Sequence, residues 1–387
     1  MITSAYSFVA LLLAVAGGLK LLEAKSRWKI FEFLPAIVML YFVVMLMSTF
    51  GFWQQTEVIN QAYAQLKQNI LPAMIFLMLL NSDLRQIRKL GGKIILAFFA
   101  AAISIGIAFI LAFILFQSAL AEGAWKTLAA LSGSWMGGTG NMAAIQMALD
   151  VPDASMGYTL LIDSIDYALW VMLLLALVPY AKRFAKWTGA DTSQLDEVGQ
   201  NLSSDSKQVS GDQTTSLLFL LAASLVVSVG TQQLAEWLPT SAFFTHTTWT
   251  VLIVTVLGVL AAMTPISKLF GAVELSNLML YLIIGLIASR ANFAELAAAP
   301  TYILMGMVIL LLHGLMMLVF AKLFKFDLFT CGVASLANIG GVASAPILAA
   351  AYSRALIPIG VLMAMLGYII GTGGGLVVGK VLSLIAA

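Results

Sequence analysis

Charged side chains are scarce in this sequence: 20 Lys and Arg and 18 Asp and Glu make up 10% of its 387 residues. A water-soluble domain carries about 25% charged residues, and hydrophobic residues here reach 61%. Because so few polar side chains cannot cover a soluble surface, most of the chain is expected to face lipid. This excludes a cytosolic enzyme. The net charge of +2, without a basic stripe, also excludes nucleic acid as a partner.

Cysteine and the common catalytic motifs are also lacking. The single Cys331 lies in an apolar run, which leaves no disulfide framework and no thiolate cluster for a metal. The sequence contains no HExxH, GxSxG, P-loop or CxxC motif. We therefore expect neither an enzyme nor an organic cofactor, and any energy must come from an ion gradient or from the solute's own gradient.

Long apolar runs dominate the chain, whose mean hydropathy is +1.00. Residues 1–24 are apolar before they are charged, the reverse of a cleaved signal peptide, so this segment is expected to be a first membrane span. A spanning helix needs about 20 mostly apolar residues. Ten segments meet this criterion: 5–23, 33–52, 63–81, 94–116, 156–181, 216–235, 249–266, 273–289, 300–321 and 356–380.

Two further apolar stretches, 125–149 and 328–352, are each interrupted by a glycine-rich centre. Sliding the chain by 203 residues lays Gly340-Gly341 on Gly137-Gly138, and the order of the flanking segments then matches as well. Such a run of segments indicates an internal repeat. The expected organisation is a first repeat at 1–181, a polar linker at 182–213 with nine charged residues, and a second repeat at 214–387.

The distribution of Lys and Arg decides how the interrupted stretches run. If each is a re-entrant hairpin, 16 of the 20 basic residues fall on one side of the membrane; if both cross, the tally is 10 against 10. The positive-inside rule favours the hairpins, with both termini outside and the linker in the cytoplasm. Each half then has five crossings, an odd number, so the second half is inverted relative to the first.

The two hairpin tips are the first candidate site. Irregular backbone at membrane depth is tolerated only where protein buries it or where it lines a wet cavity. Glycines let a ligand approach the backbone, and the half-helices that follow would direct free N–H groups at an anion. The alternative is close helix packing through small residues. The candidate substrate-binding residues are Ser134, Gly137, Gly138, Thr139, Gly140, Asn141, Asn338, Gly340, Gly341 and Ser344, with Ser132 beside them.

Two carboxylates lie three residues apart, on one helical face of an expected span. A carboxylate at membrane depth is a functional hypothesis by default. We expect proton or sodium coupling at Asp166, the deeper residue, with a sodium site near it, and Asp163 as its partner or gate; the alternative is that Asp163 caps an interfacial turn. His313 is expected to be hydrogen-bonded between helices rather than to titrate in a proton path. Trp135, within the first tip, would stack on substrate, plug a gate or simply pack.

The two tips also carry a family resemblance. At Trp135-Met-Gly-Gly-Thr-Gly-Asn141 and Asn338-Ile-Gly-Gly-Val-Ala-Ser344, the chain resembles an uncharacterised bacterial membrane family, numbered 819 among the domains of unknown function. More distantly, it is similar to the sodium/glutamate symporter and sodium/citrate carriers, within the wider group of cation/proton antiporters and bile-acid-type symporters.

The resemblance implies a sodium- or proton-coupled elevator transporter, usually a homodimer, whose hairpin-bearing core slides against a scaffold of the early spans. It transfers substrate binding to Gly137, Gly138 and Gly140 and to Gly340 and Gly341. The second tip departs from the Gly-Gly-x-Gly of the carboxylate carriers and has no nearby arginine to clamp a second carboxylate.

The sequence therefore predicts an all-α integral membrane protein with two inverted repeats, each of five transmembrane helices and one re-entrant hairpin. We expect a secondary active transporter in the bacterial inner membrane, working as a homodimer, for a small anionic or zwitterionic metabolite. A non-transporting scaffold or regulator is the alternative. An intramembrane hydrolase is weaker, because its two aspartates would share one helix.

Overall fold

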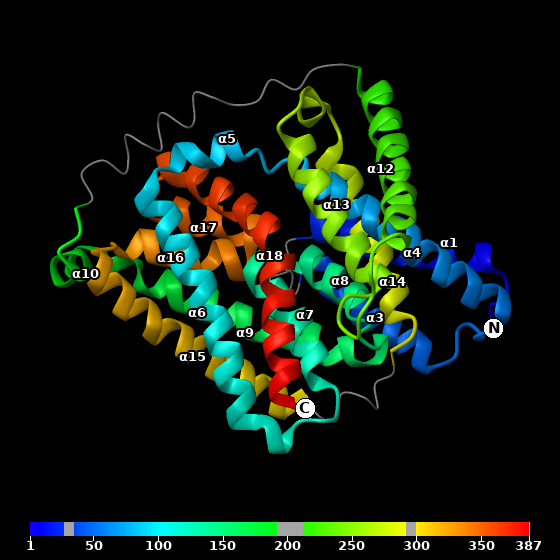
Figure 1. The fold of residues 1–387 in the computed structure, drawn as a ribbon, viewed down its shortest axis with the longest axis horizontal. Helices are drawn as coiled ribbons and strands as arrows, with labels where there is room; N and C mark the ends of the chain where they lie inside the picture. Colours follow the sequence, from blue (N-terminus) through cyan, green and yellow to red (C-terminus); the bar gives the residue numbers. More distant parts are fainter. Residues whose placement is uncertain (27–34, 192–211, 292–298, 387) are drawn as a thin grey trace.

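The computed structural model describes residues 1–26, 35–191, 212–291 and 299–386, and helices make up nearly all of this part of the chain (Figure 1). Extended pairing in these ranges is limited to one isolated bridge between Ile2 and Trp53. In an apolar solvent a helix satisfies every backbone donor and acceptor within its own segment. The prediction of an all-α fold is confirmed.

Six helical segments of the described residues are long and apolar enough to cross a membrane. The bent combination of α4 (Glu57–Leu79) with the segment Leu84–Leu90, which contains α5 (Leu84–Ile87), would be a seventh, with a bend of 41°. The chain is therefore a multi-pass membrane protein. The six segments are α1 (Ala5–Lys25); α6 (Gly92–Phe116) with its extension to Ala119; α9 (Met156–Leu177) continuing into α10 (Ala181–Thr188); α12 (Gln213–Glu236); α15 (Ala299–Phe324); and α18 (Ile357–Ala386) with the turn before it.

Three expected spans form helices shorter than a straight membrane crossing requires. These are α3 (Ala36–Thr49), α13 (His246–Ala262) and α14 (Ala272–Ala288), with 14, 17 and 17 residues. At 1.5 Å per residue, 14 residues reach about 21 Å, against about 30 Å for the hydrocarbon core. Of the three, α3 falls well short of its predicted segment, with 14 residues against the 20 of 33–52, whereas α13 and α14 match the predicted lengths to within one residue. Residues 27–34 and 292–298 lie outside the described part.

The first interrupted stretch is a helical hairpin. α7 (Ala124–Gly137) ends and α8 (Thr139–Ala148) begins at Gly138, whose φ is +88°. A methyl group at Gly133, four residues before the end of α7, would collide with the side chain of Ile145, near the middle of α8. The two helices therefore fold back on each other around the glycine, a backbone conformation that other residues adopt only with strain.

The second interrupted stretch has the same form. α16 (Leu328–Ile339) and α17 (Gly341–Tyr352) are separated at Gly340, and Gly341 has a φ of +59°. A methyl group at Gly332 would lie 3.1 Å from the side chain of Leu348 on the returning helix. Two helix pairs far apart in sequence thus turn back at the glycine-rich centres.

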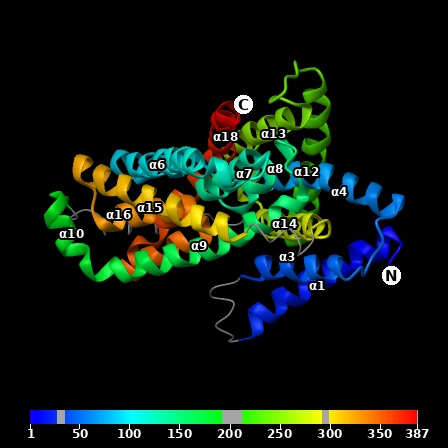
Figure 2. The same ribbon diagram turned by 90° about the horizontal axis from the view of Figure 1, so that it is seen from below.

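Buried apolar side chains form two clusters that divide the helices. The first is built mainly from α6, α7, α9, α15, α16, α17 and α18. The second is built mainly from α1, α3, α4, α8, α12, α13 and α14. In Figure 1, α6, α9, α15 and α16 lie on one side and α1, α12 and α13 on the other, and Figure 2 shows α1 and α3 together at the edge of the second group. The linker 182–213 falls largely on residues 192–211, outside the described part.

Candidate functional site

Both hairpin tips line one cavity with a volume of about 310 Å³. Helices α4, α9, α14 and α18 supply other parts of its wall. The structure thus brings together residues separated by about 200 positions in the sequence. Of the residues singled out from the sequence, those that line this cavity are Ser134, Gly138, Thr139, Gly140, Asp163, Gly340 and Gly341.

The first tip presents the start of α8 to the cavity. Thr139 and Gly140, its first two residues, line the wall, and no side chain caps this helix. A methyl group at Gly140 would lie 2.5 Å from the sulfur of Met78 on α4, so the tip also packs closely against that helix. The first N–H groups of α8 have no partner within the helix and carry the positive end of its dipole.

Asn141 braces this tip instead of lining the cavity. Its Nδ2 donates to the carbonyl oxygen of Gly137 at 2.6 Å, and its Oδ1 accepts from Oγ1 of Thr372 at 2.6 Å. Because Thr372 belongs to α18, these two bonds tie the first tip to that helix. Asn141 is 1% exposed, and its side-chain oxygen and nitrogen both have partners.

Gly137 is needed for packing. Four glycines spaced by four residues run along α18, and a methyl group at Gly371 would lie 2.8 Å from Cα of Gly137. One turn further along, a methyl group at Gly375 would lie 2.9 Å from Cα of Gly133. Gly137 therefore serves close helix packing through small residues, which was the alternative to ligand binding at the tips. The other two members of the α18 glycine row are Gly367 and Gly379.

The second tip presents the start of α17, which again has no side-chain cap. Asn338 holds the preceding helix: its Nδ2 donates to the carbonyl oxygens of Ala334 at 2.9 Å and Phe98 at 3.3 Å. Ser344 is 1% exposed, and the side chain of Tyr167 on α9 lies near its Oγ. That hydroxyl lies beside Gly340, where a methyl group would collide with it.

Two tyrosines that the sequence did not single out complete the wall. Methyl groups at Gly138 and Gly341 would lie 3.6 and 4.0 Å from the same atom, Cε1 of Tyr368, so this ring lies between the two tips. Tyr167 lines the cavity from α9, and its ring contacts Gly340. Weak signals in the sequence could have pointed to both tyrosines. Tyr167 follows Asp163 by one helical turn, and Tyr368 is next to a glycine of the α18 row.

Asp163 is the carboxylate that reaches the cavity. Its Oδ1 accepts hydrogen bonds from Ser134 Oγ and Trp135 Nε1, each at 3.0 Å. Both donors belong to the last turn of α7, so the first tip and the carboxylate are joined directly. Trp135 is fully buried with its ring edge-on to Phe109, and it holds Asp163 instead of standing free in the cavity.

Asp166 points elsewhere. It is fully buried, does not line the cavity, and neither of its carboxylate oxygens has a hydrogen-bond partner in the structure. A methyl group at Gly306 on α15 would collide with this carboxylate. The structure therefore separates the two aspartates, with Asp163 at the cavity and Asp166 between α9 and α15.

His313 is hydrogen-bonded between helices, as expected. Ser104 Oγ donates to the carbonyl of Ala101, so it accepts from His313 Nδ1 at 2.7 Å. The other ring nitrogen, Nε2, then accepts from Ser335 Oγ at 2.8 Å, and Trp170 Nε1 donates to that oxygen at 2.8 Å. The donor and the acceptor nitrogen of the His313 ring thus each have a hydrogen-bond partner, as expected for a neutral imidazole. This network joins α6, α15, α16 and α9.

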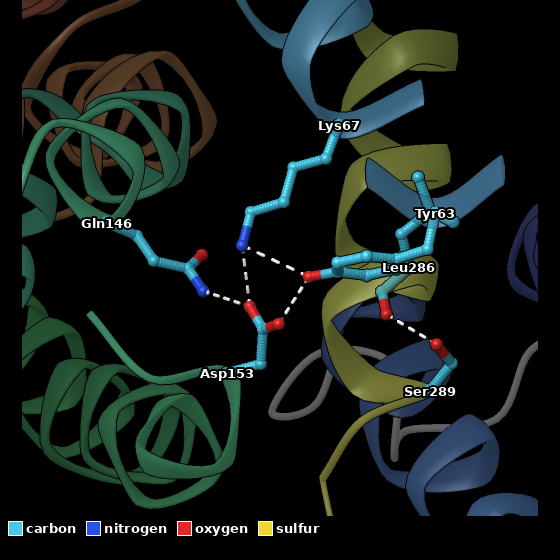
Figure 3. Close-up of polar contacts among 6 residues, drawn as sticks. All are labelled: Tyr63, Lys67, Gln146, Asp153, Leu286 and Ser289. Carbon is cyan, nitrogen blue, oxygen red and sulfur yellow. Dashed lines mark hydrogen bonds and ion pairs between the residues drawn. The ribbon is translucent and has the colours of Figure 1, made fainter. Parts of the chain in front are cut away.

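A second polar cluster joins the first hairpin to α4, and the sequence did not reveal it (Figure 3). Asp153 Oδ1 receives Lys67 Nζ at 2.7 Å and Gln146 Nε2 at 2.7 Å. The hydroxyl of Tyr63 donates to the other oxygen, and Arg290 lies over the Tyr63 ring with its Cζ 4.3 Å from the centroid. Tyr63 and Lys67 lie one turn apart on α4, and this spacing can be read from the sequence. The sequence does not show that Asp153, in the loop after the first hairpin, is their partner.

The family comparison agrees with a whole-chain relationship. No curated protein matches the chain significantly. A family model described as "Protein of unknown function (DUF819)" matches residues 10–385, which is nearly all of the sequence. This multi-pass, all-helical membrane protein belongs to the DUF819 family of proteins of unknown function.

Proposed function

We propose that the protein is a secondary active transporter for a small polar metabolite, driven by a sodium or proton gradient across the bacterial inner membrane. The observation that carries the proposal is a cavity lined by both glycine tips and by Asp163. Discontinuous helices that meet around a cavity between the repeats are the usual construction of a transporter's solute site. A scaffold protein has no need to keep such a space open.

The division of the helices supports an elevator-type movement. One apolar cluster contains mainly the later helices of each half, including both hairpins' first helices. The other contains the early helices together with α8, the second helix of the first hairpin. The cavity lies where the two groups meet, since Met74 and Met78 of α4 face the tips across it. In such a movement α8 would follow α7, to which Gly138 joins it, and would slide against α4 and α13, so that the cavity moves with both tips.

The finer arrangement belongs to the same proposal. We assign the two inverted repeats to 1–181 and 214–387, with the hairpins 125–149 and 328–352 in a shared core, the termini outside and the linker in the cytoplasm. The distribution of basic residues supports this orientation. A homodimer would give the early-helix group a fixed partner against which the core moves.

Ion coupling is assigned to Asp163. Within the described part of the chain, its Oδ1 receives both hydrogen bonds and its Oδ2 has no partner. A sodium ion, together with backbone carbonyls of the tips, or a proton alone would take this oxygen while the cavity holds no solute. A solute's cationic group would then replace the ion at the same oxygen, so that ion and solute exchange. Asp166, buried without partners, is assigned to a supporting role in proton coupling.

The test compares two glycine variants with equal backbone strain. Gly138→Ala and Gly91→Ala both place a side chain at a positive φ, +88° and +81°, but only Gly138 lines the cavity. Purified full-length protein is reconstituted into liposomes, and uptake from a mixture of labelled metabolites is measured under sodium or proton gradients. We expect uptake by the unaltered protein and by Gly91→Ala, and its loss in Gly138→Ala. Absence of gradient-driven uptake of any solute by folded, unaltered protein would favour the scaffold alternative.

A further inference from the structure

Charged side chains are rare among the described residues that line the cavity. Among the described residues that line it, Asp163 alone carries a formal charge, and the lining contains no Lys, Arg or His. Two hydrogen-bond donors and no acceptor face its Oδ1, which suits a carboxylate that acts as an acceptor. This part of the wall is therefore a place for a cationic group of the solute.

The tips provide the opposite polarity. The first residues of α8 and α17 line the same cavity, and neither helix has a side-chain cap. Each helix start is equivalent to about half a positive elementary charge, so the two together contribute about one. The hydroxyl of Ser344 and the side chain of Tyr167 lie beside Gly340 on the same part of the wall, and both carry O–H groups that can donate to an anion. This part of the wall suits a carboxylate.

The negative charge of Asp163 and the positive charge of the two helix starts nearly cancel in sum, but they lie at different parts of the cavity wall. Among the lining residues that the structure describes, a dicarboxylate would meet one negative side chain and no Lys or Arg, so one of its charges would stay uncompensated. A simple amine would pair with Asp163 and leave the helix starts without an anion. Only a solute that carries one charge of each sign satisfies both parts of the wall.

The rest of the lining is apolar or neutral. Met74, Met78, Leu280 and Met365 contribute apolar surface, and the remaining polar side chains are uncharged amides, hydroxyls and phenols. A volume of about 310 Å³ lies at the small end of ligand cavities. The solute is therefore small, and its side chain is uncharged.

We infer that the cavity binds a zwitterion of the α-amino acid type with an uncharged side chain, its ammonium group at Asp163 and its carboxylate at the two tips. This inference rests on the proposed function, because it names the solute class of the same site. It separates this chain from carriers of dicarboxylates, which need a second cationic group.

The test uses solutes that differ by one charged group. L-leucine is compared with isoamylamine, which lacks the carboxylate, and with 4-methylpentanoate, which lacks the amine; L-alanine, ethylamine and propanoate form a second set, and succinate represents dicarboxylates. Binding to the purified full-length protein is measured by calorimetry in sodium buffer at constant ionic strength, with the other standard L-amino acids included. We expect at least one neutral amino acid to bind about tenfold or more tightly than both of its truncated analogues and than succinate.

Asp163→Asn should remove most of the advantage of the zwitterion over the carboxylate-only analogue. The matched control is Glu274→Gln, which removes an exposed carboxylate of α14 that does not line the cavity, and it should keep the advantage. Equal or tighter binding of succinate or of a truncated analogue would overturn the inference, and so would the failure of every L-amino acid to bind. The analogue series on the unaltered protein decides this even if Asp163→Asn does not fold. Gradient-driven uptake of some other solute in the broad screen would then leave the proposed function standing without the zwitterion assignment.

Discussion

The contact between α18 and the first tip should respond strongly to one added methyl group. In Gly371→Ala the new Cβ would lie 2.8 Å from Cα of Gly137 and 2.8 Å from Nδ2 of Asn141. Carbon atoms pack at about 3.5–4.0 Å, so α7 and α18 would have to separate by close to 1 Å. Overpacking of this kind costs about 1–3 kcal/mol.

Gly373→Ala is the matched control on the same helix. It lies two residues away, and a methyl group there would meet no atom within 4 Å. Replacing a helical glycine by alanine where there is space stabilises by about 0.5–1 kcal/mol. The two variants should therefore shift the stability of the folded protein in opposite directions.

The assay is thermal unfolding of each purified variant in the same detergent, followed by uptake in liposomes. We expect a lower unfolding midpoint and little uptake for Gly371→Ala, because the displaced helix releases the bond between Thr372 and Asn141. Gly373→Ala should unfold at an equal or higher temperature and transport normally. Equal midpoints for the two variants would refute the close packing of α18 on the first tip.

Three other substitutions test separate parts of the structure. Trp135→Phe keeps the aromatic contact but removes one hydrogen-bond donor to Asp163. A hydrogen bond to a charged group contributes about 1.5–3 kcal/mol, so the concentration for half-maximal uptake should rise about tenfold, the lower end of that range. An unchanged concentration would contradict this role of Trp135. His313→Ala should lower stability by about 1–3 kcal/mol while the pH profile of uptake keeps its shape, whereas a changed profile would place His313 on a proton path. Lys67→Gln should lower stability by about 1 kcal/mol without altering solute preference, since this ion pair lies outside the cavity lining; a changed preference would link the cluster to the solute site.

The sequence located the two tips because glycine-rich interruptions of apolar runs have few structural explanations at membrane depth. It could not say which tip residues face the solute. Gly137 and Asn141 turned out to pack against α18, and this contact depends on a row of glycines more than 220 positions away. The four-residue spacing of these glycines can be read from the sequence, but the sequence does not show that α7 is the helix packed against them.

The choice between the two aspartates shows a second limit. Residues three positions apart share a helical face, yet they differ by about 60° around the axis at 3.6 residues per turn. That difference places Asp163 against Ser134 and the cavity and Asp166 against Gly306. Depth in the span suggested Asp166 for ion coupling, whereas the neighbours of each carboxylate are set by the packing of α9 against α7 and α15.

The most direct measurement for the central claim, that the cavity between the tips is the coupled solute site, is thermal stabilisation by sodium at fixed ionic strength and by pH. A ligand that binds only the folded state stabilises it by about 2.7 kcal/mol at a hundredfold excess over its Kd. We predict that sodium or acid stabilises the unaltered protein and that Asp163→Asn abolishes this response, while Asp166→Asn retains a response to sodium. A response that persists in Asp163→Asn, or no response in the unaltered protein, would contradict the claim.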